Sequence, residues 1–169
     1  MAEPLVYVDT AIFLNVIQKE VDPKTGVPLW ADSLKILLAA SRGDIRLVGS
    51  TLILVELNGE KGNASSGFRA QRDQVVYQFL DSLDVEWVEV DHLIARETRQ
   101  VAERYGLRGA DAAHLATAVR RNADYFVSRD RGFPYGETAG RRTQVLQPRV
   151  LWTPTLEDQQ VDQEAAGAS

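Results

Sequence analysis

Short runs of apolar, often β-branched residues alternate along this chain with longer segments of helical periodicity, and this alternation restricts the fold more than any other feature. The short runs are predicted strands over residues 5–8, 45–48, 85–90, 125–128 and 145–152. The helical segments are residues 11–18, 34–43, 51–57, 68–83, 92–105 and 110–122. Strands joined by helices run parallel, with the helices packed on both faces of the sheet. The sequence therefore predicts an α/β fold of three layers, α/β/α, around a central parallel sheet.

Capping residues mark where several of these helices begin and end. Asp91 is predicted to cap the helix that runs to Tyr105, and Gly106 is predicted to end it. Residues 51–57 fit either a strand or a helix; because Ser50 or Thr51 can cap a helix, we predict a helix there. Residues 59–67 are predicted to form a polar loop.

The chain has the size and composition of one soluble domain. Its 169 residues are 44% apolar and 25% charged, with no Cys, which excludes thiol catalysis. We expect a domain over residues 1–153 and a polar, disordered tail over residues 154–169. The first residues do not resemble a signal peptide, and no apolar run reaches the ~20 residues of a membrane span. We therefore expect a cytoplasmic protein with no membrane partner.

Charge is distributed unevenly along the chain. The net charge of the chain is -5, but all charged residues after Arg149 are acidic, so residues 1–149 are nearly neutral. No Lys follows Lys61, and the basic groups of the second half are therefore Arg, whose planar forks suit phosphate. A basic and aromatic group in this half could form a groove for single-stranded nucleic acid, or equally a solvated loop. It comprises Arg129, Arg131, Arg141, Arg142, Phe133 and Tyr135.

Acidic residues are the strongest candidates for chemistry. Asp9 and Asp130 each follow a predicted strand, so they lie at the same edge of a parallel sheet, where ligands bind. Glu56 and Asp111 stand within apolar segments, where an uncompensated carboxylate is costly. One explanation is a hard divalent cation, Mg²⁺ or Mn²⁺, held by three or four converging carboxylates.

Each of these acids also has a structural interpretation. Asp9 could be a helix N-cap, and Asp111 could be favoured by the dipole at a helix N-terminus. Glu56 could face solvent on the polar stripe of an amphipathic helix, and Asp130 could be a turn residue. His114 could assist the site from the helical face that carries Asp111, or it could be a packed histidine.

Four segments of the chain resemble, in the same order, the PIN domain, particularly the VapC-like toxins of bacterial toxin–antitoxin pairs. The segments are VYVDT at 6–10, LVEL at 54–57, GADAAHLATA at 109–118 and FVSRDRGF at 126–133. Position by position, the resemblance implies that an acidic quartet binds metal. The quartet is Asp9, Glu56, Asp111 and Asp130, with Thr10 and Ser128 as hydroxyl support.

The resemblance also implies partners. VapC-like proteins bind a cognate antitoxin, and a homodimer is expected on the same ground. An apolar set in the first helices is predicted to belong to the core, or in part to line a groove for an antitoxin segment. It comprises Leu14, Ile17, Trp30, Leu34 and Leu38. The chain is longer than the family pattern, with a polar tail and extended loops at 59–67 and 134–142.

The activity implied by the resemblance is that of a divalent-metal-dependent endoribonuclease, the toxin of its pair. One or two Mg²⁺ or Mn²⁺ ions would lower the pKa of a bound water, align it with a phosphodiester and stabilise the developing charge. Such hydrolysis needs no 2′-hydroxyl, so the expectation of RNA rests on the resemblance. A stand-alone RNA-processing nuclease and a weakly active binding module are the alternatives. A haloacid dehalogenase-like phosphatase and a receiver domain fit less well, because Ala11 and the early position of Lys61 break their patterns.

Overall fold

The computed structural model describes residues 2–59, 74 and 78–167, and a mostly parallel sheet lies at its centre. The strands of the described chain are β1 (Leu5–Val8), β2 (Arg46–Ser50), β3 (Val85–Val88), β4 (Tyr125–Val127), β5 (Thr138–Ala139) and β6 (Thr143–Leu146). Their order in the sheet is β3-β2-β1-β4-β6-β5. Every neighbouring pair is parallel except β5 and β6. The predicted α/β fold with a central parallel sheet is confirmed.

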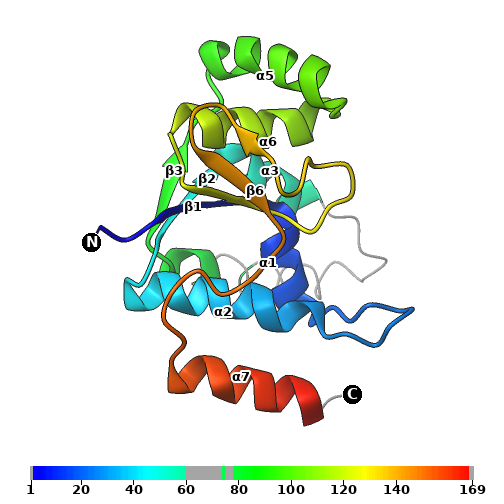
Figure 1. The fold of residues 1–169 in the computed structure, drawn as a ribbon, viewed down its shortest axis with the longest axis vertical. Helices are drawn as coiled ribbons and strands as arrows, with labels where there is room; N and C mark the ends of the chain where they lie inside the picture. The colour runs from blue at the N-terminus through cyan, green and yellow to red at the C-terminus, as the bar shows by residue number, and fades with distance from the viewer. Residues whose placement is uncertain (1, 60–73, 75–77, 168–169) are drawn as a thin grey trace.

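Helices cover both faces of this sheet (Figure 1). The described helices are α1 (Thr10–Ile17), α2 (Leu29–Arg42), α3 (Thr51–Gly59), α5 (His92–Tyr105), α6 (Gly109–Arg120) and α7 (Leu156–Gly167). α6 lies over one face with α5 outside it, while α1 and α2 lie over the other. Residues 78–82 are helical; the rest of the helix predicted over 68–83 and most of the loop predicted over 59–67 lie outside the described residues. No described helix is long and apolar enough to cross a membrane.

β1 is buried on both faces of the sheet. Val6 and Val8 pack with residues of α1 and α2, whereas Tyr7 packs on the opposite face with Leu115 of α6 and Phe126 of β4. Successive side chains of a strand point to opposite faces, so a strand covered on both sides needs apolar residues at every position. This explains why the sequence pattern identified the strand.

The order of the strands reverses at β1. β2 and β3 extend the sheet in one direction, and β4 and β6 extend it in the other. A parallel sheet leaves a crevice at the carboxyl ends of the strands where its order reverses. Asp9 and Asp130 follow the two strands that border this point, β1 and β4. Since α6 returns along the sheet before β4, its amino end, which carries Asp111, lies at the same edge.

The last strand differs from its predicted position. A strand was predicted over 145–152, but the chain forms a hairpin of β5 and β6, and β6 ends at Leu146. Pro148, which has no backbone N–H to donate, follows two residues later. Gly140, at φ 61°, supplies the left-handed conformation at the turn of the hairpin. The loop expected over 134–142 therefore contains the edge strand.

The expected disorder of residues 154–169 is wrong over 156–167, which form α7 on the outer side of α2 (Figure 1). Val161 and Ala165 pack against Trp30 of α2. Lys35 Nζ lies 2.6 Å from Asp162 Oδ1, and Trp152 Nε1 donates to Asp158 Oδ2 at 2.9 Å. Few apolar residues contribute to this contact, so the tail resembles a disordered segment in composition, although α2 offers it an apolar surface and complementary charge.

We expect Val161→Asp to destabilise the protein, because it places a carboxylate against Trp30 in the small cluster that holds α7. Loss of one buried aliphatic side chain and burial of a charge should lower the free energy of unfolding by about 2–4 kcal/mol in urea titrations. Gln160→Asp, at the exposed neighbouring position, adds the same charge and should change it by less than about 0.5 kcal/mol. Equal losses in the two variants would show that α7 does not dock through this cluster.

Candidate active site

Asp9 lies at the N-cap position of α1, but its side chain makes no capping hydrogen bond. Its Oδ2 accepts a hydrogen bond from Ser128 Oγ at 2.5 Å. Its Oδ1 is buried and has no hydrogen-bond partner among the described residues. Asp91, in contrast, caps α5 as predicted, by accepting from the backbone N–H groups of Leu93 and Ile94. Asp9 therefore occupies the N-cap position, as the structural interpretation expected, but its side chain does not cap the helix.

Burial raises the pKa of Asp9 to about 7, and the negative charges of Asp130 and Glu56 act in the same direction. The hydrogen bond from Ser128 and the proximity of His114 oppose this shift without cancelling it. The ionised carboxylate is thus held at a considerable cost. A cation beside the unpartnered Oδ1 would remove that cost.

Glu56 projects from α3 toward α1 and α6, with its side chain 31% exposed. Its Oε2 accepts hydrogen bonds from Thr10 Oγ1 and, at 2.9 Å, from His114 Nε2. Burial raises the pKa of Glu56, but these hydrogen bonds outweigh burial, so the pKa is lowered overall. Glu56 is therefore an anchored, ionised carboxylate, and its interpretation as a solvated position on an amphipathic helix is wrong.

Asp111 and Asp130 line one surface pocket, together with Gly106, Leu107, Arg108, Arg131 and Gly132. Partial desolvation raises the pKa of Asp111 and of Asp130, and Glu56 repels both. Asp111 and Asp130 also repel each other. Asp130 is joined to the buried part of the site through Ser128, whose Oγ accepts from the Asp130 backbone N–H at 3.0 Å.

The four predicted acids thus lie at the carboxyl edge of the sheet, close enough for each to interact electrostatically with at least one of the others. Among the residues that the structure describes, no three carboxylate or imidazole groups are arranged to enclose a metal ion. The donor chemistry nevertheless fits a hard divalent cation, because all four donors are carboxylates and Asp9 presents a buried oxygen that no described residue satisfies. Asp9 and Glu56 are each anchored through a single oxygen. Ser128 binds Asp9 Oδ2, and Thr10 and His114 bind Glu56 Oε2.

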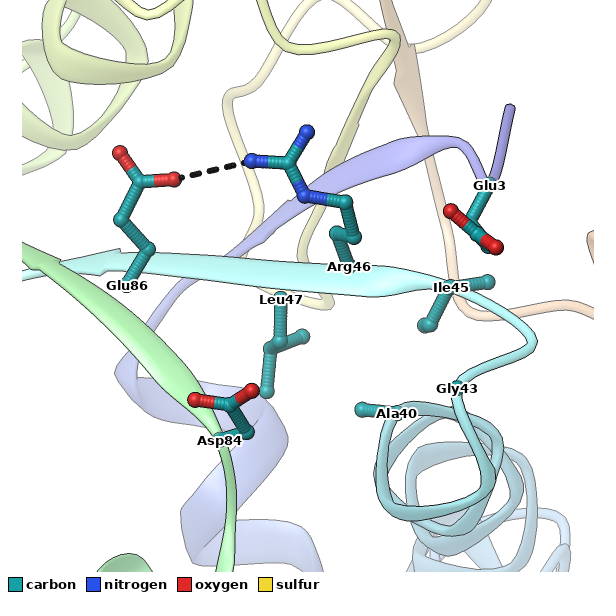
Figure 2. A pocket seen from close by; sticks show the side chains of 8 residues that line it. All are labelled: Glu3, Ala40, Gly43, Ile45, Arg46, Leu47, Asp84 and Glu86. Carbon is teal, nitrogen blue, oxygen red and sulfur yellow. Dashed lines mark hydrogen bonds and ion pairs between the residues drawn. The ribbon is translucent and has the colours of Figure 1, made fainter.

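A second pocket lies at the opposite edge of the sheet, where β2 and β3 begin (Figure 2). Glu3, Asp84 and Glu86 stand around it, and Arg46 Nη2 lies 3.4 Å from Glu86 Oε2. None of the four predicted acids lines this pocket. Its carboxylates therefore serve as matched control positions for the acids at the carboxyl edge.

A protein-family model described as the PIN domain matches residues 6–136. The chain belongs to the PIN domain family. The match includes all four acids and most of the sheet. A search of curated proteins found no significant match to the chain.

Solved structures share the PIN fold of this chain at low sequence identity. A chain of VapBC2 from Rickettsia felis bound to a promoter DNA fragment aligns with a TM-score of 0.59 and 15% identity, over 85% of this chain and 98% of that one. A chain of DNA-bound VapBC from Salmonella typhimurium aligns with a TM-score of 0.57 and 22% identity, over 86% of this chain and 98% of that one. A chain of a toxin–antitoxin complex from Klebsiella pneumoniae aligns with a TM-score of 0.56 and 16% identity, over 76% of this chain and 90% of that one. These likenesses establish a shared fold.

Tyr7 contacts the site in this PIN domain, although the sequence pattern indicated only a residue of a predicted strand. Its hydroxyl lies 2.8 Å from His114 Nδ1 and accepts from the Ser50 backbone N–H at 3.2 Å. His114 is 2% exposed and touches Glu56 directly, so it is both buried and part of the site. Its helical spacing from Asp111 was the available signal, whereas nothing in the sequence distinguishes Tyr7 from its apolar neighbours.

The predicted basic and aromatic group does not form one groove in the PIN fold. Phe133 is buried in the core, and Arg142 pairs with Asp124 instead of facing the acids. Arg129 Nη2 lies 3.5 Å from Asp32 Oδ2. Arg131 alone of the four arginines lines the acidic pocket, where it is joined by Arg108, which the sequence did not single out.

Proposed function

We propose that this PIN domain is a divalent-metal-dependent endoribonuclease and the toxin of a toxin–antitoxin pair. The observation that carries the proposal is the buried Oδ1 of Asp9, which has no hydrogen-bond partner among the described residues and lies close enough to Asp130 and Glu56 to be repelled by both. A buried anion is tolerated when a cation compensates it. Family membership and the fold shared with toxin–antitoxin complexes support the nuclease and toxin assignments.

Asp9, Glu56, Asp111 and Asp130 are the residues that would hold Mg²⁺ or Mn²⁺, as one ion or two. The bound metal would supply Lewis acidity, activating a water and stabilising charge on the phosphodiester oxygens. Ser128 fixes one oxygen of Asp9, and Thr10 and His114 together fix one oxygen of Glu56. The two carboxylates are therefore oriented before substrate arrives. Asp111 and Asp130, in the surface pocket, are the acids that an entering phosphate meets first.

Arg108 and Arg131 are the groups best placed to bind the phosphates of the substrate. Both line the pocket of Asp111 and Asp130, and neither guanidinium forms an ion pair with another described residue. Arginine suits a phosphate because its planar fork donates two parallel hydrogen bonds.

We expect Arg108→Ala and Arg131→Ala each to raise KM for RNA about tenfold with little change in kcat, since a charged hydrogen bond contributes about 1.5 kcal/mol or more. Each should also reduce the slope of log KM against log salt concentration by about 0.7. Arg99→Ala, which removes an equal charge from the exposed face of α5, should leave both quantities unchanged. Equal effects at position 99 would mean that only overall charge matters.

The proposal includes a cognate antitoxin and a homodimer, as the resemblance implies. A small reading frame upstream of this gene, encoding a DNA-binding amino terminus, would supply the antitoxin. Co-expression should relieve the growth arrest caused by the chain alone and yield a stable complex on size-exclusion chromatography. The chain alone should elute as a dimer.

The direct test of the activity uses the purified chain with single-stranded and hairpin RNA oligonucleotides in Mg²⁺ or Mn²⁺. We expect internal cleavage of RNA and no cleavage of DNA of the same sequence. Cleavage of both would widen the substrate class to nucleic acids in general. Binding without cleavage in either metal would instead identify a PIN-fold binding module and overturn the nuclease proposal.

A further inference from the structure

A continuous chain of hydrogen bonds runs from the backbone of β2 to the Glu56 carboxylate. The Ser50 N–H donates to Tyr7 Oη at 3.2 Å, Tyr7 Oη lies 2.8 Å from His114 Nδ1, and His114 Nε2 lies 2.9 Å from Glu56 Oε2. Ser50 and Tyr7 are 0% exposed and His114 is 2% exposed, so water does not compete for these contacts. The network connects β2, β1, α6 and α3.

The two ends of this network fix which groups donate there. A backbone N–H can only donate, so Ser50 uses an acceptor position of the Tyr7 oxygen. The phenol proton is then free to point at His114 Nδ1, and burial raises the pKa of Tyr7 well above its ordinary value, so the phenol keeps that proton. The ionised Glu56 carboxylate can only accept, so His114 Nε2, which faces it at 2.9 Å, is the donor of that hydrogen bond.

Rigid packing keeps Tyr7 in this position. Its ring stacks on Phe126 with centroids 5.5 Å apart and an interplanar angle of 13°, and it meets the His114 ring edge-on at 6.0 Å. The phenol therefore cannot turn away without disturbing the core around β1 and β4. The orientation of the imidazole is set from behind by a residue that does not itself reach the acids.

The effect of this network falls on one oxygen of Glu56. His114 Nε2 and Thr10 Oγ1 both bind Oε2, from α6 and α1 respectively, while Oε1 has no hydrogen bond to another described residue. Two donors on the same oxygen fix the carboxylate group and leave the other oxygen available to a ligand. A histidine that served only to fill space would not need a donor aimed at a half-buried carboxylate.

We propose that His114 is a positioning residue, held by Tyr7 with its Nε2 proton toward Glu56, which fixes that carboxylate through Oε2 so that Oε1 can bind the catalytic cation. This inference rests on the proposed function for the identity of the cation. The donor role of His114 Nε2 does not depend on it, and can be measured in the protein without metal or RNA.

Two substitutions at position 114 separate positioning from packing. The side-chain amide of Gln places its nitrogen near the position of Nε2, whereas that of Asn places it near Nδ1. We expect His114→Gln to retain Mn²⁺ affinity within about threefold, and His114→Asn to weaken it by about tenfold or more, as loss of an outer partner of a metal ligand does. Free Mn²⁺ is counted by electron paramagnetic resonance, without RNA, and thermal unfolding of both variants is recorded in parallel. Equal losses of affinity in the two variants, in proportion to their losses of stability, would overturn the inference.

The donor role of His114 Nε2 is tested by nitrogen-15 NMR of the histidine rings in the metal-free wild type. We expect Nε2 of the His114 ring to carry a proton that is hydrogen-bonded to Glu56. An Nε2 without a proton would overturn the inference. Absence of RNA cleavage by the wild type would refute the proposed function but not the positioning of Glu56, so the two failures are distinguishable.

Discussion

Asp9→Asn is expected to abolish cleavage while making the metal-free protein more stable. The amide can still accept the Ser128 hydrogen bond, but it no longer offers an anionic oxygen to a cation. We expect kcat/KM to fall by about 10³-fold or more, equivalent to about 4 kcal/mol of transition-state stabilisation. Initial rates on an RNA oligonucleotide at saturating Mg²⁺ measure this loss.

The gain in stability follows from the pKa of Asp9, which is raised from 3.8 to about 7 in the folded chain. A carboxyl group whose pKa is raised by folding favours the folded state below its unfolded pKa, and that contribution is lost as the pH rises through the folded value. The cost at pH 8 is on the order of 4 kcal/mol. Asp9→Asn removes this cost, so its stabilising effect should increase between pH 4 and pH 8 in urea titrations performed with a chelator.

Asp84→Asn is the matched control for Asp9→Asn. Asp84 is exposed and lines the pocket at the opposite edge of the sheet, so this variant loses the same charge away from the site (Figure 2). Neither activity nor stability should change measurably. If Asp9→Asn instead destabilised the protein at every pH, Asp9 would be a structural residue.

Chelation of divalent cations should abolish cleavage and also weaken RNA binding. Without a cation, four carboxylates that already repel one another face an entering phosphate, and the domain up to Arg149 has no net positive charge to compensate. We expect the rate to fall by at least about 10³-fold. The Kd for RNA should rise about tenfold or more, a repulsion of about 1.4 kcal/mol.

Excess Mn²⁺ should restore both cleavage and binding, and Asp9→Asn should lose little further affinity for RNA when the chelator is added. Fluorescence anisotropy with a labelled, non-cleavable RNA separates binding from the reaction. Undiminished cleavage in excess chelator would refute metal dependence. Unchanged binding with lost cleavage would show that the arginines, and not the cation, attract the phosphates.

The fold could be predicted because its main elements depend on local patterns. A strand such as β1, covered on both faces, must be apolar throughout, and helices such as α5 carry their own start and stop signals in Asp91 and Gly106. α7 could not be predicted in the same way, since its stability comes from Trp30 and Lys35 of α2, more than a hundred residues away in the chain. The β5–β6 hairpin likewise depends on pairing with β4 more than on its own composition.

The sequence singled out the acids of the candidate site and two hydroxyls that support them, Thr10 and Ser128, but not the buried tyrosine behind them. Asp9 and Asp130 stood out because they follow strands that the sheet brings side by side, and Glu56 because a carboxylate is unusual in an apolar segment. The role of Tyr7 could not be predicted, because the sequence pattern of a β-strand does not distinguish a tyrosine that only fills the core from one whose hydroxyl is hydrogen-bonded. Arg142 was grouped with the site by sequence proximity, but the hairpin carries it to Asp124 at the other edge of the sheet.

The most direct test of a shared cation at the carboxyl edge is a crystal structure of the protein soaked in Mn²⁺, read by anomalous scattering. We predict an anomalous peak bound by Asp9 Oδ1, with Glu56, Asp111 and Asp130 around it at direct or water-bridged distance. A peak confined to the pocket of Glu3, Asp84 and Glu86, or an unbound Asp9 Oδ1 at saturating Mn²⁺, would contradict the account.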